Sequence, residues 1–241
     1  AFEYLPPVDV TYGDFIRAIV TADYEVVPED GAGLRAAMIE AFRLRGVYPD
    51  GVQSLAEDAL LWPVVEDLHL PFDPYREKLV DNALAYDRSG RPLDRDESRR
   101  SMNRWAAELS RWAVTNAQRL GLDRHHKVAL DGFHTVFRFA PDGQLLVELV
   151  AQFTQTDDAA AKDPAYGGVA FRGGATVIAS ASGNVRYVVS KPLHDERRQR
   201  QTDYVNELDR ADAALAWTDE GYDATRMRAR TSFAALHRRL Y

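Results

Sequence analysis

The sequence contains no cysteine among its 241 residues. This absence excludes a disulfide scaffold, a cysteine nucleophile, a cysteine-ligated zinc site and an iron–sulfur cluster. The sequence also lacks a run of about 20 apolar residues that would cross a bilayer, and its first residues have no signal-peptide pattern. These features predict a soluble, cytoplasmic protein with no membrane partner. The chain begins at Ala1 rather than at a methionine, which indicates a piece cut or processed from a longer protein.

Basic residues are outnumbered by acidic ones, with 30 Lys and Arg against 37 Asp and Glu, so the formal net charge is −7. An acidic chain does not favour broad nucleic-acid binding, and no nucleic-acid partner is expected. Arginine and histidine side chains nevertheless concentrate in residues 226–239, where apolar spacing predicts a C-terminal helix. A solvated helix face is the ordinary explanation for such a run, and an anion- or partner-binding surface is the alternative.

Hydrophobic spacing in the first part of the chain predicts helices. Thr11-x-x-Asp14 has the form of a capping box with Asp in place of Glu. A second helix is expected to carry Leu34, Met38 and Phe42 in steps of four and to end at Gly46. Further helices are expected to end at Trp62 and to span residues 74–84. We therefore expect a helical region over residues 1–90 and an α+β region over residues 91–241, unless the two form one continuous domain.

The pattern changes from helical to strand-like after Gly121. Before it, apolar residues from Met102 to Trp112 recur in steps of three and four, which predicts an amphipathic helix. Beyond it, alternating apolar residues and short turns predict an antiparallel sheet of at least four strands over residues 126–190, followed by C-terminal helices. The fold class expected is α+β, with the Met102–Trp112 helix covering one face of the sheet. We expect that face to carry Phe133, Phe137, Phe139, Leu145, Val147, Leu149 and Phe153.

No complete catalytic motif is present. None of the six histidines fits H-E-x-x-H, in which two imidazoles one helical turn apart bind zinc. The remaining constellation is His126, Asp131 and His134, which would bind a metal ion if their side chains converged at a strand end. Surface or capping roles are the alternative explanation for these three residues.

Two stretches, residues 11–49 and 171–201, resemble the C-terminal region of large bacterial proteins related to gluzincin metallopeptidases. In those proteins a helix with an (A/T)-(I/L)-x-T-A-D core precedes an "EAFRxRGI" helix, and a "GxVRYxxxK" strand precedes an "ERRxRQ" helix. The matching residues here are Thr21, Ala22, Asp23, Glu40, Ala41, Phe42, Arg43, Arg45, Gly46, Val185, Arg186, Tyr187, Lys191, Glu196, Arg197, Arg198 and Gln201.

This resemblance implies that the zinc ligands lie upstream of Ala1 and that the chain is the noncatalytic remainder. It would then hold no cofactor, although the full-length protein would hold zinc, and its partner would be an upstream catalytic domain or another protein. Arg186 and Lys191 are expected to flank an exposed strand. With Arg197 and Arg198, which are expected either to bond back to the sheet edge or to form a recognition surface, they are the interaction candidates.

Three functional hypotheses follow from the sequence. The first is a noncatalytic scaffold or interaction module of a larger metallopeptidase-like protein. The second is a free-standing hydrolase or metal-dependent enzyme that uses His126, Asp131 and His134. The third is an anion- or partner-binding module that uses the arginine-rich C-terminal helix.

Overall fold

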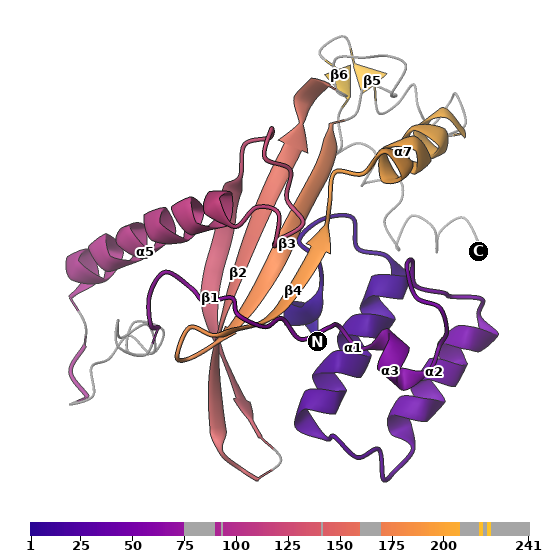
Figure 1. Ribbon diagram of the computed structural model, residues 1–241, viewed down its shortest axis with the longest axis horizontal. Coiled ribbons are helices and arrows are strands. Elements are labelled where there is room, and N and C mark those ends of the chain that lie inside the picture. Colours follow the sequence, from indigo (N-terminus) through magenta and orange to yellow (C-terminus); the bar gives the residue numbers. More distant parts are fainter. Residues whose placement is uncertain are drawn as a thin grey trace. The chain divides into compact units, whose positions relative to one another are not determined.

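The computed structural model has the α+β architecture expected from the sequence: helices precede a four-stranded antiparallel sheet, and a helix follows it (Figure 1). The structure describes residues 1–74, 90–92, 94–140, 142–159, 170–207, 217–218 and 221–222. The boundary expected near residue 90 adjoins residues 75–89, which lie outside the described part, and it stays a prediction.

The chain divides into two compact units. The first consists of residues 1–155 and 173–192, and the second consists of residues 156–172 and 193–241. Most of the sheet and all the helices that precede it belong to the first unit, so this unit contains the main apolar core.

The N-terminal elements are η1 (Phe2–Tyr4), α1 (Tyr12–Val26), α2 (Leu34–Leu44) and α3 (Glu57–Leu60). The predicted capping box is present: the Asp14 amide donates to Thr11 Oγ1 at 3.1 Å, and the Thr11 amide donates to the Asp14 carboxylate at 2.8 Å. After α2, Gly46 has a φ of 69°, which suits glycine at the end of a helix. The helix expected over residues 74–84 lies almost wholly outside the described residues.

Helix α5 (Arg95–Thr115) confirms the expected amphipathic helix. Its N-terminus is capped by Asp94, whose carboxylate accepts hydrogen bonds from the amides of Asp96 and Glu97. Trp105 and Leu109 are fully buried, and the Trp112 indole donates to the His69 carbonyl at 2.7 Å. No helix in the described part of the chain is long and apolar enough to cross a membrane.

The sheet has the strand order β1-β2-β3-β4. Its strands are β1 (Ala129–Phe139), β2 (Leu145–Asp157), β3 (Phe171–Ser180) and β4 (Val185–Lys191).

The register pairs Phe133 with Ala151 and Phe137 with Val147, so the predicted apolar set does share one face. As expected, α5 covers part of this face, because Trp105, Trp112, Leu149 and Phe153 belong to one buried cluster. We expected all seven apolar side chains of this face to be buried, and this is wrong near the β1–β2 turn, where the side chains do not belong to the buried cluster. Phe137, Phe139 and Leu145 are 38%, 67% and 55% exposed.

The opposite face of the sheet is also covered. Figure 1 shows α1–α3 on the side of the sheet away from α5, and Ala18 of α1 packs with Val150 and Ile178 in a second apolar cluster. The interpretation of β4 as an exposed strand is therefore wrong: its residues alternate between buried and half-buried, and Lys191 is only 9% exposed.

The second unit contains α7 (Asp195–Glu207) and a small hairpin of β5 (Trp217–Thr218) and β6 (Gly221–Tyr222). Arg198 of α7 lies 2.7 Å from the Asp157 carboxylate, and Arg197 donates to the carbonyl of Arg172 at 3.0 Å. Of the two alternatives expected for these arginines, the contacts agree with bonding back to the sheet, but the residues contacted lie at strand ends. The arginine-rich residues 226–239 lie outside the described residues.

Candidate functional site

The three metal-site candidates do not form a ligand group. His126 Nδ1 is 3.3 Å from the carboxylate of Asp123, while Asp131 accepts a hydrogen bond from Thr154 at 2.9 Å. His134 lies in β1 opposite Val150. Among the described residues, which include all three candidates, no group of three or more His, Asp or Glu side chains has a geometry that would hold a metal ion.

The four basic interaction candidates contact the chain itself. Lys191 Nζ is 2.7 Å from the Asp14 carboxylate, so β4 is joined to the start of α1. Arg197 and Arg198 make the strand-end contacts of the second unit, and Arg186 joins a larger group of charges. That these residues also form a recognition surface stays a prediction.

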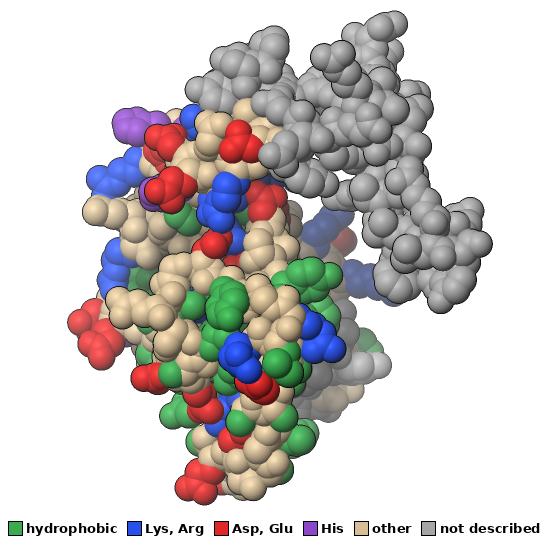
Figure 2. All heavy atoms as spheres, turned by 90° about the vertical axis from the view of Figure 1, so that its right-hand side faces the viewer, with side chains coloured by type: hydrophobic (Ala, Val, Ile, Leu, Met, Phe, Trp, Pro, Cys, Tyr) green, Lys and Arg blue, Asp and Glu red, His purple; other side chains and the backbone are tan. Residues whose placement is uncertain are grey.

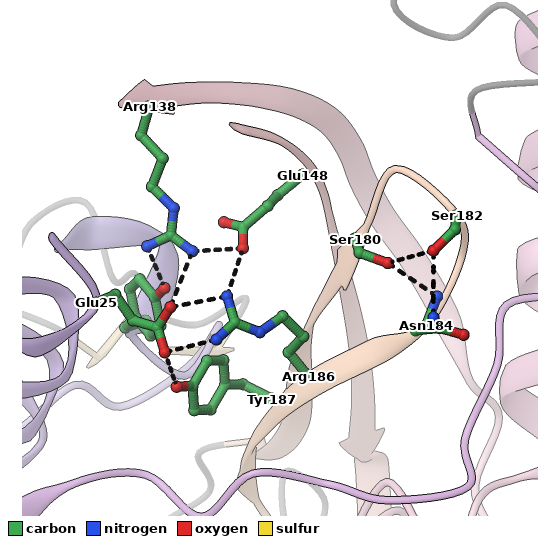
Figure 3. Close-up of polar contacts among 9 residues, drawn as sticks. Glu25, Arg138, Glu148, Ser180, Ser182, Asn184, Arg186 and Tyr187 are labelled. Atoms are coloured by element: carbon green, nitrogen blue, oxygen red, sulfur yellow. Dashed lines mark hydrogen bonds and ion pairs between the residues drawn. The ribbon is translucent and has the colours of Figure 1, made fainter. Parts of the chain in front are cut away.

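The most concentrated polar group in the first unit is a charge cluster between α1 and the sheet (Figure 3). We define the charge cluster as Glu25, Arg138, Glu148 and Arg186 with the hydroxyls of Tyr4 and Tyr187. Its two arginines and two glutamates balance in formal charge. The glutamate side chains are 9% and 6% exposed, and those of Arg138 and Arg186 are 14% and 33% exposed.

Glu25, in the last turn of α1, receives the largest number of contacts. Arg186 approaches it with both terminal nitrogens, each 2.7 Å from a different carboxylate oxygen. This two-pronged pairing fixes the angle between the side chains as well as their distance. The Tyr187 hydroxyl donates to the same carboxylate. A negative charge at a helix C-terminus is unfavourable because it lies at the negative end of the helix dipole. The hydrogen bonds and ion pairs from Arg186 and Tyr187 offset this unfavourable position of the Glu25 carboxylate.

Arg138 connects β1 to the rest of the charge cluster. Its guanidinium donates to the Tyr4 hydroxyl at 2.7 Å and to the Glu148 carboxylate, and it lies 3.6 Å from Glu25. Glu148 pairs with Val136 in the β1–β2 register, so it stands diagonally across from Arg138 on the same face. The Tyr4 ring packs edge-on against Tyr187 at 5.4 Å.

A bulge in β4 brings adjacent residues to the same carboxylate. Val185 pairs with Ala179 and Tyr187 pairs with Ile178, which leaves Arg186 as the extra residue. In a regular strand neighbouring side chains point to opposite faces, whereas a bulge redirects one of them. Arg186 and Tyr187 therefore both bond to Glu25.

Sequence reasoning missed Tyr4, Glu25, Arg138 and Glu148. An available signal was the pair of opposite charges, Arg138 and Glu148, on strands that are otherwise rich in apolar residues. The alternation places Arg138 and Glu148 on the less apolar face of the sheet. Elements that pack on this face, among them η1 and α1, leave Glu148 buried and Arg138 partly buried.

In the charge cluster the pKa values of both tyrosines and both arginines are raised above their ordinary values. Burial, reinforced by the Glu148 charge, raises the pKa of Tyr4, and burial with the bond to Glu25 raises the pKa of Tyr187. Burial alone would lower the pKa of Arg138, but the attraction of Glu148 and Tyr4 outweighs it, and the pKa is raised. Because a general acid or base works best with a pKa near the operating pH, these groups are suited to fixed pairing rather than to proton transfer.

A second anchor lies at the same end of α1. Arg35 of α2 is 2% exposed and pairs with Asp23 at 2.6 Å and with Glu57 at 2.8 Å. It also donates to the carbonyls of Val27 and Pro28 at 2.9 and 3.0 Å. Asp23 and Glu25 thus hold the end of α1 to α2 and to the sheet respectively.

The outer surface on the α1–α3 side has no dominant charge. Figure 2 shows Lys and Arg side chains interspersed with Asp and Glu over this face. An exposed ion pair of this kind joins Glu40 and Arg43 of α2 at 2.6 Å. Among the described residues of this face, charge therefore does not mark an anion-binding surface.

Comparisons of the chain with models of protein families, with curated proteins and with solved structures found no match.

Proposed function

We propose that this chain is a noncatalytic C-terminal scaffold module of a larger metallopeptidase-like protein, with the zinc site on a segment upstream. The observation that supports the proposal is that residues of the matching motifs contact other parts of this chain. Most of the polar residues that resemble the gluzincin-related family make hydrogen bonds or ion pairs within the chain.

The T-A-D core illustrates this use. Thr21 accepts a hydrogen bond from the Trp62 amide at 3.0 Å, and Asp23 pairs with Arg35. In the "VRYxxxK" strand, Arg186 and Tyr187 bond to Glu25, and Lys191 pairs with Asp14. These contacts hold α1 to α2, to residue 62 and to the sheet, as a domain that supports or docks another segment requires.

Two measurements test the proposed function together. The gene is expected to encode an H-E-x-x-H segment before Ala1, and the longer product should bind zinc and cleave peptides. The present chain, expressed alone, should fold cooperatively without binding zinc. A gene without that segment, or peptidase activity in this chain that depends on His126 or His134, would overturn the proposal and favour the metal-enzyme hypothesis.

A further inference from the structure

The two edge strands of the sheet differ in their backbone hydrogen bonds to neighbouring segments. The start of the outer edge of β4 is covered by residues 64–68, whose backbone makes the bonds Val65 N to Arg186 O at 2.8 Å and Val185 N to Leu68 O at 2.9 Å. Strand β1 forms the other edge. Within the described residues, no backbone hydrogen bond joins β1 to any segment but β2.

Strand β1 has two of the features that keep an edge from pairing, a bulge between Leu130 and Gly132 and the inward-directed charge of Arg138, but both lie outside residues 133–137. Proteins protect exposed edges with short strands, lysine or proline, but β1 has 11 residues and contains neither residue type. Its one arginine, Arg138, is directed into the charge cluster. Near its end, Phe137 and Phe139 are exposed on the same face, beyond the cluster that α5 buries. A row of backbone groups that no described segment pairs with, beside exposed aromatic rings, is suited to an incoming β-strand.

The sequence of β1 is symmetric about Thr135 in its two nearest phenylalanines. Phe133 and Phe137 lie two residues before and two residues after Thr135, and all three side chains share one face. We propose that β1 pairs antiparallel with β1 of a second copy, with the two-fold axis at Thr135. Each Phe133 then lies opposite Phe137 of the second copy, and this aromatic contact occurs twice.

The proposed register also avoids charge repulsion. His134 lies opposite Val136 of the second copy, and Arg138 lies opposite Gly132, so no like charges meet across the new pair. The interface is the same patch on both chains, as a closed two-fold dimer requires. This inference goes beyond the proposed function and does not depend on it, because it concerns the full 241-residue chain alone.

The absence of cysteine permits a direct cross-linking test. In the proposed dimer the two Thr135 Cα atoms are about 4.5–5.5 Å apart, within the range that a disulfide spans. Mild oxidation of Thr135→Cys should give a covalent dimer. The matched control is Leu44→Cys, at a position on α2 that is 69% exposed, and it should remain monomeric. Equal cross-linking of the two variants, or none at Thr135→Cys, would overturn the proposal.

Sedimentation equilibrium gives a second, independent readout. The wild-type chain should dimerise, and Phe137→Lys should raise the dissociation constant by about tenfold or more, equivalent to ~1.4 kcal/mol. Leu44→Lys should leave the constant unchanged. A wild-type chain that remains monomeric up to ~100 µM, where a dimer of low-micromolar affinity would be well populated, contradicts the proposal. So does a dimer that is insensitive to Phe137→Lys.

Discussion

The two faces of the sheet are held by different chemistry. On the α5 face, Trp105, Leu109 and Phe153 form part of a buried apolar cluster. On the α1 face, apolar contacts are supplemented by ion pairs that converge on Glu25. Apolar burial is non-directional, whereas paired charges stabilise only when both partners are in place. The comparison indicates that α5 provides stability that tolerates small shifts, while the charge cluster fixes where α1 sits.

The largest expected effect is on the α5 face. Trp105→Ala removes a side chain that is 1% exposed and leaves a cavity, so the free energy of unfolding should fall by about 4 kcal/mol. Urea denaturation measures this change. Val114→Ala on the same helix, where the side chain is 58% exposed, should cost less than ~0.5 kcal/mol. Similar losses in the two variants would mean that α5 does not form the main core.

The second prediction concerns the α1 face. Glu148→Gln removes the charge that balances Arg138 in a buried setting, and the free energy of unfolding should fall by about 3 kcal/mol. The same substitution at Glu40, whose ion pair with Arg43 is half exposed, should change it by less than ~0.5 kcal/mol. If urea denaturation shows the same small change in the free energy of unfolding for both substitutions, the charge cluster stabilises the fold no more than an exposed ion pair does.

A smaller effect is expected at the other end of α1. Lys191→Met breaks the 2.7 Å pair with Asp14, but the carboxylate keeps its two hydrogen bonds from Thr11. We therefore expect a loss of about 1–2 kcal/mol in the free energy of unfolding. The control is Lys127→Met at an exposed position, and this variant should unfold like the wild type. A loss at Lys191 as large as that of Glu148→Gln would contradict this ranking.

The smallest effect concerns alkaline pH. The pKa values of Tyr4 and Tyr187 are raised in the folded state, mainly by burial, so folding is favoured while both tyrosines are neutral. This contribution is fully present below the unfolded tyrosine pKa of about 10 and is lost as the pH rises toward the folded values. In an ultraviolet titration of the 11 tyrosines, two should ionise after the rest. Tyr4→Phe and Tyr187→Phe should each remove one late ionisation, and a single transition near the ordinary pKa of tyrosine would contradict the assignment.

The fold followed from the sequence where local patterns decide it. The Thr11–Asp14 capping box, the Trp105–Trp112 stripe and the alternation in β1 and β2 each have a short-range physical cause, and each was confirmed. The burial of Phe137 was predicted wrongly. Alternation shows which side chains share a face of the sheet, but not how far along the strands the covering helix extends.

The charge cluster could not be predicted in the same way. Glu25 meets Arg186 only because α1 docks on the sheet and because a bulge redirects one residue of β4. Both are tertiary features with no fixed spacing in the sequence. The resemblance singled out Arg186 and Tyr187, yet it did not identify Glu25 as the carboxylate that they share.

The measurement that tests the account most directly is native-state hydrogen exchange of Arg138→Met. If the charge cluster holds α1 on the sheet, the amides of α1 should lose about 2–3 kcal/mol of protection beyond any loss in α5. The amides of α5 serve as the internal control, because that helix packs on the opposite face. Equal losses in the two helices, or unchanged protection of α1, would contradict the claim that these charges position the helix.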